Sequence, residues 1–406
     1  MKKSYNGKES LDIPSLRGDR LRYEVHSPTL VQSPWQREVV YHSGHAFFLA
    51  LSQAITEAQH SIDIETYIFA DDGIGRRTLQ QLQLAASRGV RIRLLVDGIG
   101  SFDWLEKHYS TLPKTGIELR AFNPVPWPFA RTFYSALTNP GRFFKLWSTI
   151  NRRNHRKVYI FDNKRIFTGS MNITSDSFRW RESAIGLEVS GPNDILASFS
   201  LTWSESYHVH NFQQFVKKRR ERWRVRNSAF VRTNLNRKSR LNNMNDLIDR
   251  IDKAKKQVLI TNPYFVPPTH LLTALCQAAE RGAKVVLLLP EKSDVKIVKI
   301  VSQYFYPRLL AAGVRIFEYL PTVLHAKTAI IDDWAVIGSS NLNHRSLFHD
   351  LELDVIPASE TSLKSLQTQF ESDLKLSHEI EMSSLKTKRW WQYIMPRLVL
   401  LIKNWI

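Results

Sequence analysis

The sequence contains the stretch HRKVYIFD at residues 155–162, which is followed by GSMN at residues 169–172. A second stretch, HAKTAIID at residues 325–332, is followed by GSSN at residues 338–341. Each copy has the pattern H-x-K-x4-D and then, after a turn, G-S-x-N. One copy would be a weak motif, but two copies with the same continuation indicate an internal repeat.

The sequence around the two motifs repeats as well. AASRGVRI at residues 85–92 matches AAERGAKV at 278–285, and TGIELR at 115–120 matches AGVRIF at 312–317. The separation of the matching segments is nearly constant up to this point, but it is shorter between the two histidines. The first half therefore carries an insert over about residues 124–151, just before its motif.

Apolar segments with strand and helix periods alternate through both halves, and glycines follow the expected helices at Gly89 and Gly282. This alternation predicts an α/β layer structure. We expect four parts along the chain: a first repeat at 1–216, a basic linker at 217–243, a second repeat at 244–381 and an amphipathic C-terminal segment at 382–406.

The composition indicates a polyanionic partner. Lysine and arginine number 57 against 38 acidic residues, which gives a formal net charge of +19. Such an excess favours nucleic acid or an anionic membrane surface, although a merely soluble basic enzyme is an alternative. Cys276 is the only cysteine, so an intrachain disulfide and a thiolate zinc cluster are excluded. Its apolar, helix-like surroundings predict a core position.

Three basic segments offer possible membrane contacts. The insert at 124–151 and the tail at 386–406 interleave aromatic with basic residues, a composition typical of interfacial elements. The alternatives are a lid and a helix packed on the protein body. The run KKRRERWRVR at 217–226 fits either a solvated face or a phosphate-binding surface. We expect no signal peptide, and no uncharged apolar run reaches the roughly 18 residues that span a bilayer.

The spacing within each motif predicts which side chains act together. Residues i and i+2 of a strand share a face, so a histidine and the lysine two positions later should point the same way. The aspartate lies an odd number of positions after the histidine and should face the other way. We therefore expect the histidines and lysines to make the site, with each aspartate more structural. The catalytic motif residues are His155, Lys157, Asp162, His325, Lys327 and Asp332.

This set of side chains suits phosphate chemistry. Lysine supplies a point charge, serine and asparagine supply neutral donors, and histidine acts as a nucleophile or as an acid/base near neutral pH. Two such sets facing each other could run a double displacement without a metal or cofactor, since the lysines carry the developing charge. A lysine at i+2 also disfavours a divalent cation. The predicted phosphate-binding residues are Lys157, Ser170, Asn172, Lys327, Ser339 and Asn341.

Two glutamates have parallel positions after the G-S-x-N elements. Glu182 lies soon after Asn172, and Glu352 lies at nearly the same interval after Asn341. A histidine that transfers protons usually needs a carboxylate on its second ring nitrogen. We expect these glutamates to orient the two histidines, with surface ion pairing as the alternative.

The paired motifs resemble those of the phospholipase D superfamily over about residues 40–380. More narrowly, ETYIF at 65–69, NPYFVP at 262–267, VIGSSNL at 336–342 and RWW at 389–391 resemble bacterial cardiolipin synthases of the short type, without N-terminal membrane helices. The resemblance implies two tandem phospholipase D-like α/β/α sandwich repeats. They would be related by a pseudo-twofold axis, with the active site at their interface. It also implies a peripheral protein at the bacterial inner membrane, on its cytoplasmic side.

The activity implied by the resemblance is transphosphatidylation. One phosphatidylglycerol, or a phosphatidylethanolamine, would donate its phosphatidyl group to a histidine, and the hydroxyl of another phosphatidylglycerol would accept it. The resemblance implies His155 as nucleophile and His325 as acid/base, a choice that the sequence alone does not make. The alternatives are a hydrolytic phospholipase D, a nuclease or phosphodiesterase of the same superfamily, and a non-catalytic membrane scaffold. The oligomeric state is not indicated.

Overall fold

The computed structural model describes residues 33–124, 152–206 and 228–385. Apart from Ser33, all of these residues belong to one compact unit, which begins at Pro34. The predicted membrane-binding parts of the insert and of the C-terminal tail lie outside these residues, as does the basic run at 217–226. Within the described ranges, no helix is both long enough and apolar enough to cross a bilayer.

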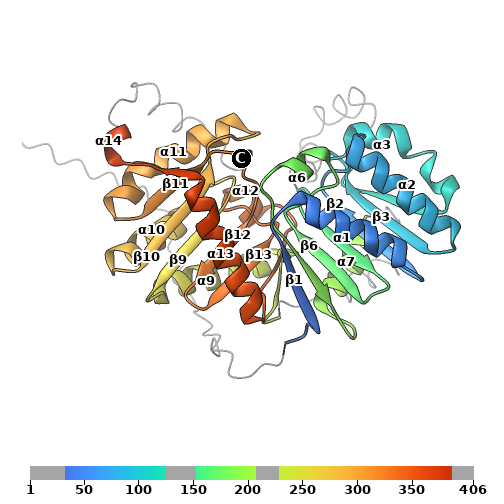
Figure 1. Ribbon diagram of the computed structural model, residues 1–406, viewed down its shortest axis with the longest axis horizontal. Helices are drawn as coiled ribbons and strands as arrows, with labels where there is room; N and C mark the ends of the chain where they lie inside the picture. Colours follow the sequence, from blue (N-terminus) through green and yellow to red (C-terminus); the bar gives the residue numbers. More distant parts are fainter. Residues whose placement is uncertain (1–32, 125–151, 207–227, 386–406) are drawn as a thin grey trace, which may run out of the picture. The chain divides into compact units, whose positions relative to one another are not determined.

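The first repeat forms a seven-stranded mixed sheet with the order β1-β7-β6-β5-β2-β3-β4 (Figure 1). Its three strands β2, β3 and β4 run parallel, and the others pair antiparallel. The strands are β1 (Arg37–Tyr41), β2 (Ser61–Thr66), β3 (Arg91–Asp97), β4 (Ile117–Phe122), β5 (Val158–Phe161), β6 (Arg165–Gly169) and β7 (Ala184–Glu188). The helices are α1 (Gly44–Glu57), α2 (Gly73–Ser87), α3 (Phe102–His108), α6 (Ser175–Arg179) and α7 (Asp194–Glu205), with a 3-10 turn at Leu112–Thr115.

The second repeat forms an eight-stranded sheet with the order β15-β11-β10-β9-β12-β13-β14-β8. Its strands are β8 (Val231–Thr233), β9 (Gln257–Thr261), β10 (Lys284–Pro290), β11 (Arg315–Tyr319), β12 (Thr328–Ile331), β13 (Trp334–Gly338), β14 (Leu353–Val355) and β15 (Ser377–Glu379). Its helices are α9 (Arg237–Lys253), α10 (Thr269–Glu280), α11 (Lys296–Ala311), α12 (His344–Phe348), α13 (Glu360–Lys375) and α14 (Met382–Leu385). The two sheets share the order of their central strands, which confirms the predicted tandem α/β repeats.

The structure corrects the predicted linker. Strand β8 pairs with β14, and α9 begins at Arg237, so both elements lie partly or wholly inside the segment 217–243. Asn236 caps α9 reciprocally with Ser239, which satisfies backbone groups that a solvated linker would leave to water. The second repeat therefore includes residues well before 244.

Alternation along the strands divides the apolar residues among three cores. In β5, Val158 and Ile160 face a central core, whereas Tyr159 and Phe161 face a core under α1 and α2. The strands of the second repeat divide in the same way between the central core and an outer one, where Cys276 is buried as predicted. The central core takes side chains from both sheets, so the two repeats bury apolar surface against each other.

Helix α13 joins the two repeats on one side. It packs against β1 of the first sheet and against β11 and β12 of the second, and its Leu366 and Phe370 lie in the central core. The carboxylate of Glu38 in β1 accepts hydrogen bonds from the backbone N–H groups of Ala358 and Ser359, just before this helix. These contacts fix the position of one sheet relative to the other. A site formed between the two sheets needs such a fixed arrangement.

Candidate active site

Both motif histidines lie just before a strand. Strands β5 and β12 begin at Val158 and Thr328, one residue after the motif lysines. Each strand runs antiparallel to the first parallel strand of its sheet, so its beginning lies beside that strand's carboxyl end. The carboxyl ends of parallel strands are the usual place for ligand sites in α/β folds.

The backbone at each histidine is hydrogen-bonded to the other repeat. The N–H of His155 donates to the carbonyl oxygen of Leu351 at 3.0 Å, and the N–H of Leu351 donates to Arg153 at 2.9 Å. In the same way, the N–H of His325 donates to Arg181 at 2.8 Å, and that of Arg181 donates to Val323 at 2.9 Å. Two short parallel bridges therefore fix the histidine segments across the interface.

Each histidine also faces a glutamate from the other repeat. The Nδ1 atom of His325 lies 2.8 Å from Oε1 of Glu182, and Nδ1 of His155 lies 3.6 Å from Oε1 of Glu352. Both carboxylates are fully buried. The sequence identified these glutamates as partners of the histidines, but it could not indicate that the pairing crosses between repeats.

The motif serines contact the backbone and the glutamates. Ser339 donates to the Glu352 carboxylate at 2.5 Å, and its hydroxyl accepts from the N–H of Leu353 at 3.0 Å. The hydroxyl of Ser170 donates to the carbonyl oxygen of Ser183 at 3.0 Å and accepts from its N–H at 2.9 Å. The structure thus shows both hydroxyls bonded to the strands and, for Ser339, to the orienting carboxylate; binding of phosphate by Ser170 and Ser339 stays a prediction.

The motif lysines and asparagines lie at the interface beside the histidines. Lys157 and Lys327 each donate from Nζ to the carbonyl oxygen of the histidine two positions earlier, the second at 2.6 Å. Asn172 accepts at Oδ1 from the N–H of Ile68 at 3.1 Å, which orients its amide. The Oδ1 atom of Asn341 is buried, and none of the described residues gives it a hydrogen-bond partner.

The motif aspartates lie outside the site. The carboxylate of Asp162 accepts from the N–H groups of residues 59–61 at 2.7–2.9 Å, and that of Asp332 accepts from residues 255–257 at 2.8–2.9 Å. Both residues have a positive φ, 51° and 49°, at the turn after the motif strand. Burial raises their pKa, but the three N–H donors outweigh it and lower the pKa overall. Naming them with the catalytic residues is thereby corrected, because they brace the strand ends.

The structure adds aromatic residues that the sequence reasoning left without a role. The ring of Tyr67 lies 4.1 Å from that of His155, and the rings of Tyr264 and Trp180 lie 5.9 and 5.6 Å from that of His325. Tyr67 and Tyr264 occupy matching places in ETYIF and NPYFVP, so the repeat itself contained a signal for them. Tyr67 forms an apolar wall beside His155, and Tyr264 forms one beside His325. Each motif histidine and the residues around it make up one half-site.

A family model described as "Cardiolipin synthase, PLD-like domain" matches residues 51–193 and 247–374, which is more than half of the chain. The chain belongs to this family. As a cardiolipin synthase family member, it is an enzyme of the phosphatidyltransferase class, and the matched ranges contain both histidine motifs.

Relatives with this family name match over most of the chain. Cardiolipin synthase B of Salmonella typhi is 30% identical over 369 residues, covering 86% of this chain and 83% of that protein. Cardiolipin synthase of Halalkalibacterium halodurans is 28% identical over 378 residues, covering 87% and 69%. Among solved structures, a phosphatidylserine synthase of Haemophilus influenzae has a TM-score of 0.66 at 14% identity, covering 91% and 95%. The last likeness supports the fold alone.

The electrostatics of this cardiolipin synthase family member differ between its two half-sites. Burial lowers the pKa of His155 well below its usual value, and Lys157 and Arg345 lower it further. Burial raises the pKa of its partner Glu352 to about 8. Glu182 behaves differently, because His325 and other neighbours outweigh burial and lower its pKa. These shifts favour an uncharged imidazole at His155 and an ionised carboxylate at Glu182, beside His325.

One cluster has a spacing compatible with a metal ion. The ligand atoms of His155, Asp350 and Glu352 lie within 4.8 Å of one another. Lys157 interacts electrostatically with Glu352, and Arg345 donates a hydrogen bond to Asp350 at 3.2 Å. Each of the two acidic residues therefore already has a basic partner. Their charges disfavour a divalent cation at this place.

Proposed function

We propose that this chain is a cardiolipin synthase that works through a phosphohistidine intermediate. It would transfer a phosphatidyl group from one phosphatidylglycerol, or from phosphatidylethanolamine, to the hydroxyl of another phosphatidylglycerol. The single observation that carries the mechanism is the crossed pairing of two histidines with two buried carboxylates at one interface. That arrangement gives one imidazole for attack and another for proton transfer.

In the first step, Nε2 of His155 attacks the phosphorus atom and the bond to the headgroup oxygen breaks. His325 gives a proton to that oxygen, so glycerol leaves as a neutral alcohol when phosphatidylglycerol is the donor. The lowered pKa of His155 supports its role as nucleophile, because attack needs an unprotonated ring nitrogen. Burial lowers the pKa of His325 overall, and the Glu182 carboxylate opposes that shift, so it helps His325 to keep the proton that this step needs.

In the second step, the hydroxyl of the acceptor lipid loses its proton to His325 and attacks phosphorus. The phosphorus–nitrogen bond breaks, cardiolipin forms and His155 is regenerated unprotonated. Lys157 and Lys327 would stabilise the charge on the phosphoryl oxygens in both steps. The proton that His325 gave in the first step returns in the second, so the cycle needs no other acid or base.

The surface next to the His325 half-site supports a lipid substrate. The aliphatic side chains of Val295, Ile297 and Ile300 are 37–39% exposed around the first turn of α11. Lys292 and Lys296 are exposed beside them. This corner lies near the site, because Tyr264 donates from its hydroxyl to Asp294 at 2.6 Å while its ring faces His325. Exposed aliphatic groups with lysines suit an anionic bilayer better than a nucleic acid.

We infer that the protein works at the surface of a bacterial membrane, on the cytoplasmic side of the inner membrane, as a peripheral protein. The two relatives described above are bacterial and carry the name cardiolipin synthase. The positive net charge of +19 would favour contact with an anionic lipid surface.

The test is product analysis with purified protein and phosphatidylglycerol vesicles without added metal. Cardiolipin and glycerol are the expected products, and mixed vesicles with phosphatidylethanolamine would identify the donor. Phosphatidic acid without cardiolipin would instead indicate a hydrolytic phospholipase D. Cleavage of DNA with no lipid product would contradict the lipid assignment and indicate a nuclease.

A further inference from the structure

The two half-sites differ at matched places. Helix α12 follows GSSN as α6 follows GSMN, and the segments after them carry the glutamates. In the second repeat, Arg345 donates from Nε to Oδ2 of Asp350 at 3.2 Å, and Asp350 lies two residues before Glu352. Two residues before Glu182, the first repeat has Trp180, whose ring makes a T-shaped contact with that of His325. An arginine–carboxylate pair therefore lies beside His155, and an aromatic ring lies at the corresponding place beside His325.

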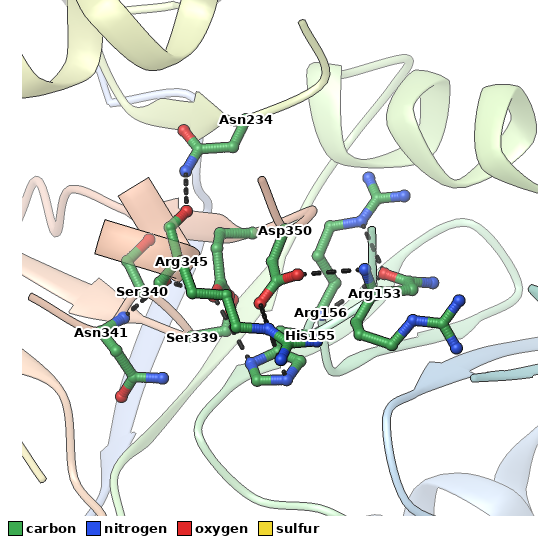
Figure 2. Close-up of polar contacts among 12 residues, drawn as sticks. Arg153, His155, Arg156, Asn234, Ser339, Ser340, Asn341, Arg345 and Asp350 are labelled. Carbon is green, nitrogen blue, oxygen red and sulfur yellow. Dashed lines mark hydrogen bonds and ion pairs between the residues drawn. The ribbon is translucent and has the colours of Figure 1, made fainter. Parts of the chain in front are cut away.

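Asp350 connects three parts of the His155 half-site (Figure 2). Its Oδ1 accepts from the backbone N–H of Arg153 at 3.0 Å, and its Oδ2 accepts from Arg345. The same Oδ2 lies 3.9 Å from Nε2 of His155, the nitrogen that does not face Glu352. The carboxylate is fully buried, whereas the Arg345 side chain keeps 23% of its surface exposed. The Asp350 carboxylate therefore lies between the Arg345 guanidinium and the reactive imidazole nitrogen, and the Arg345 side chain is partly exposed.

A phosphoryl group on Nε2 of His155 would meet Asp350 as a like charge. Two anions at this distance in a buried site repel each other strongly, unless a cation lies between them or one takes a proton. Arg345 is placed to supply that cation. Its planar guanidinium can give two parallel hydrogen bonds to phosphate oxygens, which the point charge of a lysine cannot do.

We propose that Arg345 is a third phosphate-binding cation of the site, in addition to Lys157 and Lys327, and that Asp350 is the residue that positions it over His155. The pair makes the His155 half-site the one that carries the phosphoryl group. Trp180 gives the His325 half-site an apolar wall, which suits a neutral alcohol that leaves or enters. This assignment rests on the proposed phosphohistidine mechanism and gives the two matched half-sites different tasks.

The first test needs no lipid. Binding of inorganic phosphate to the full-length protein is measured by calorimetry for wild type, Arg345→Ala and Arg179→Ala. Loss of a hydrogen bond to a charged group predicts about a tenfold or greater loss of affinity for Arg345→Ala. Arg179 is the matched control, because it lies in the equivalent helix α6 and pairs at 2.8 Å with the exposed Asp176. Equal phosphate affinity in wild type and Arg345→Ala would overturn the proposal.

The second test follows the phosphoenzyme with labelled phosphatidylglycerol. Arg345→Lys keeps the charge without the planar donor pair, so we expect a rate of phosphoenzyme formation between those of wild type and Arg345→Ala. Asp350→Asn keeps an acceptor for the N–H of Arg153 but loses the charge that holds Arg345. It should therefore weaken phosphate binding while the melting temperature stays close to that of wild type.

The outcomes separate the possible failures. If Arg345→Ala does not fold, the phosphate affinities of Arg345→Lys and Asp350→Asn test the proposal instead. Affinities equal to that of the wild type in both variants would overturn it. A lower melting temperature with unchanged phosphate affinity would show that the pair is only structural. If wild type forms no phosphoenzyme with any phosphatidyl lipid, the proposed function fails, and the phosphate titration still tests Arg345.

Discussion

The crossed pair of His325 and Glu182 gives the most direct test of the proposed mechanism. Glu182→Gln keeps the size of the side chain and removes its charge. The hydrogen bond is 2.8 Å long and the carboxylate is fully buried, so solvent cannot replace it. A hydrogen bond to a charged group contributes about 1.5–3 kcal/mol, which corresponds to roughly 10- to 150-fold in rate. We expect kcat to fall by about tenfold in Glu182→Gln and further in Glu182→Ala.

The Glu182→Gln substitution should also change how the rate of phosphoenzyme formation depends on pH. Burial lowers the pKa of His325, and Glu182 opposes that shift, so removal of its charge should lower the pKa further. His325 is the proposed acid, and the first step needs its protonated form. The alkaline decline in the rate of phosphoenzyme formation should therefore begin at a lower pH in Glu182→Gln than in wild type. Rapid-quench measurement of the labelled phosphoenzyme between pH 5 and 9 would show it.

The matched control is Glu188→Gln, a partly exposed glutamate at the end of β7 that pairs with Arg37 at 3.6 Å. It should leave both the rate and its pH profile unchanged. A Glu182→Gln enzyme that reacts at the wild-type rate with the wild-type profile would refute the idea that the carboxylate of one repeat sets the proton affinity of the other repeat's histidine.

Three further outcomes follow from the geometry. Asp162→Ala should lower the free energy of unfolding by about 1–3 kcal/mol, since three backbone N–H groups lose their acceptor; activity per folded molecule should change little, as urea denaturation and assays at equal folded concentration would show. Burial lowers the pKa of Lys327 to about 7. Sulfate, whose own charge is constant near neutral pH, should therefore bind more weakly as the pH rises through 7 and the ammonium loses its proton, and titration calorimetry would measure this. Ile297→Asp with Ile300→Asp should reduce sedimentation with anionic vesicles, whereas Leu84→Asp, at a 57% exposed aliphatic residue on α2, should not; equal loss in both proteins would count against the α11 corner as a membrane contact.

Repetition in the sequence decided how much could be predicted. The two α/β repeats, the motif histidines and lysines, and the paired glutamates all occur twice, so each copy supported the other. Strand alternation alone predicted that Asp162 and Asp332 point away from the motif histidines and lysines. Strand β8 was missed because three residues carry too little periodicity to separate a strand from a linker.

The features that could not be predicted are of two kinds. The crossing of the glutamates depends on how one sheet packs on the other, and no local pattern encodes which repeat a buried side chain reaches. The roles of Ser170 and Ser339 depend on competing acceptors, which only the folded chain brings near. Arg345 and Asp350 have no counterpart in the first repeat, so a search for repeated residues could not find them.

Under the proposed mechanism, the symmetric backbone and the asymmetric charges together explain how one interface would serve two different steps. The bridges at residues 154 and 351, and at 181 and 324, place the two imidazoles in matched positions that neither repeat could fix alone. An exactly symmetric pair would bind the phosphoryl group equally well on either histidine, and neither would then be reserved for proton transfer. Buried charge breaks that equivalence, because a change of one pKa unit corresponds to about 1.4 kcal/mol of preference between two protonation states. A few unmatched residues around the histidines are therefore enough to assign the nucleophile without any change in the fold.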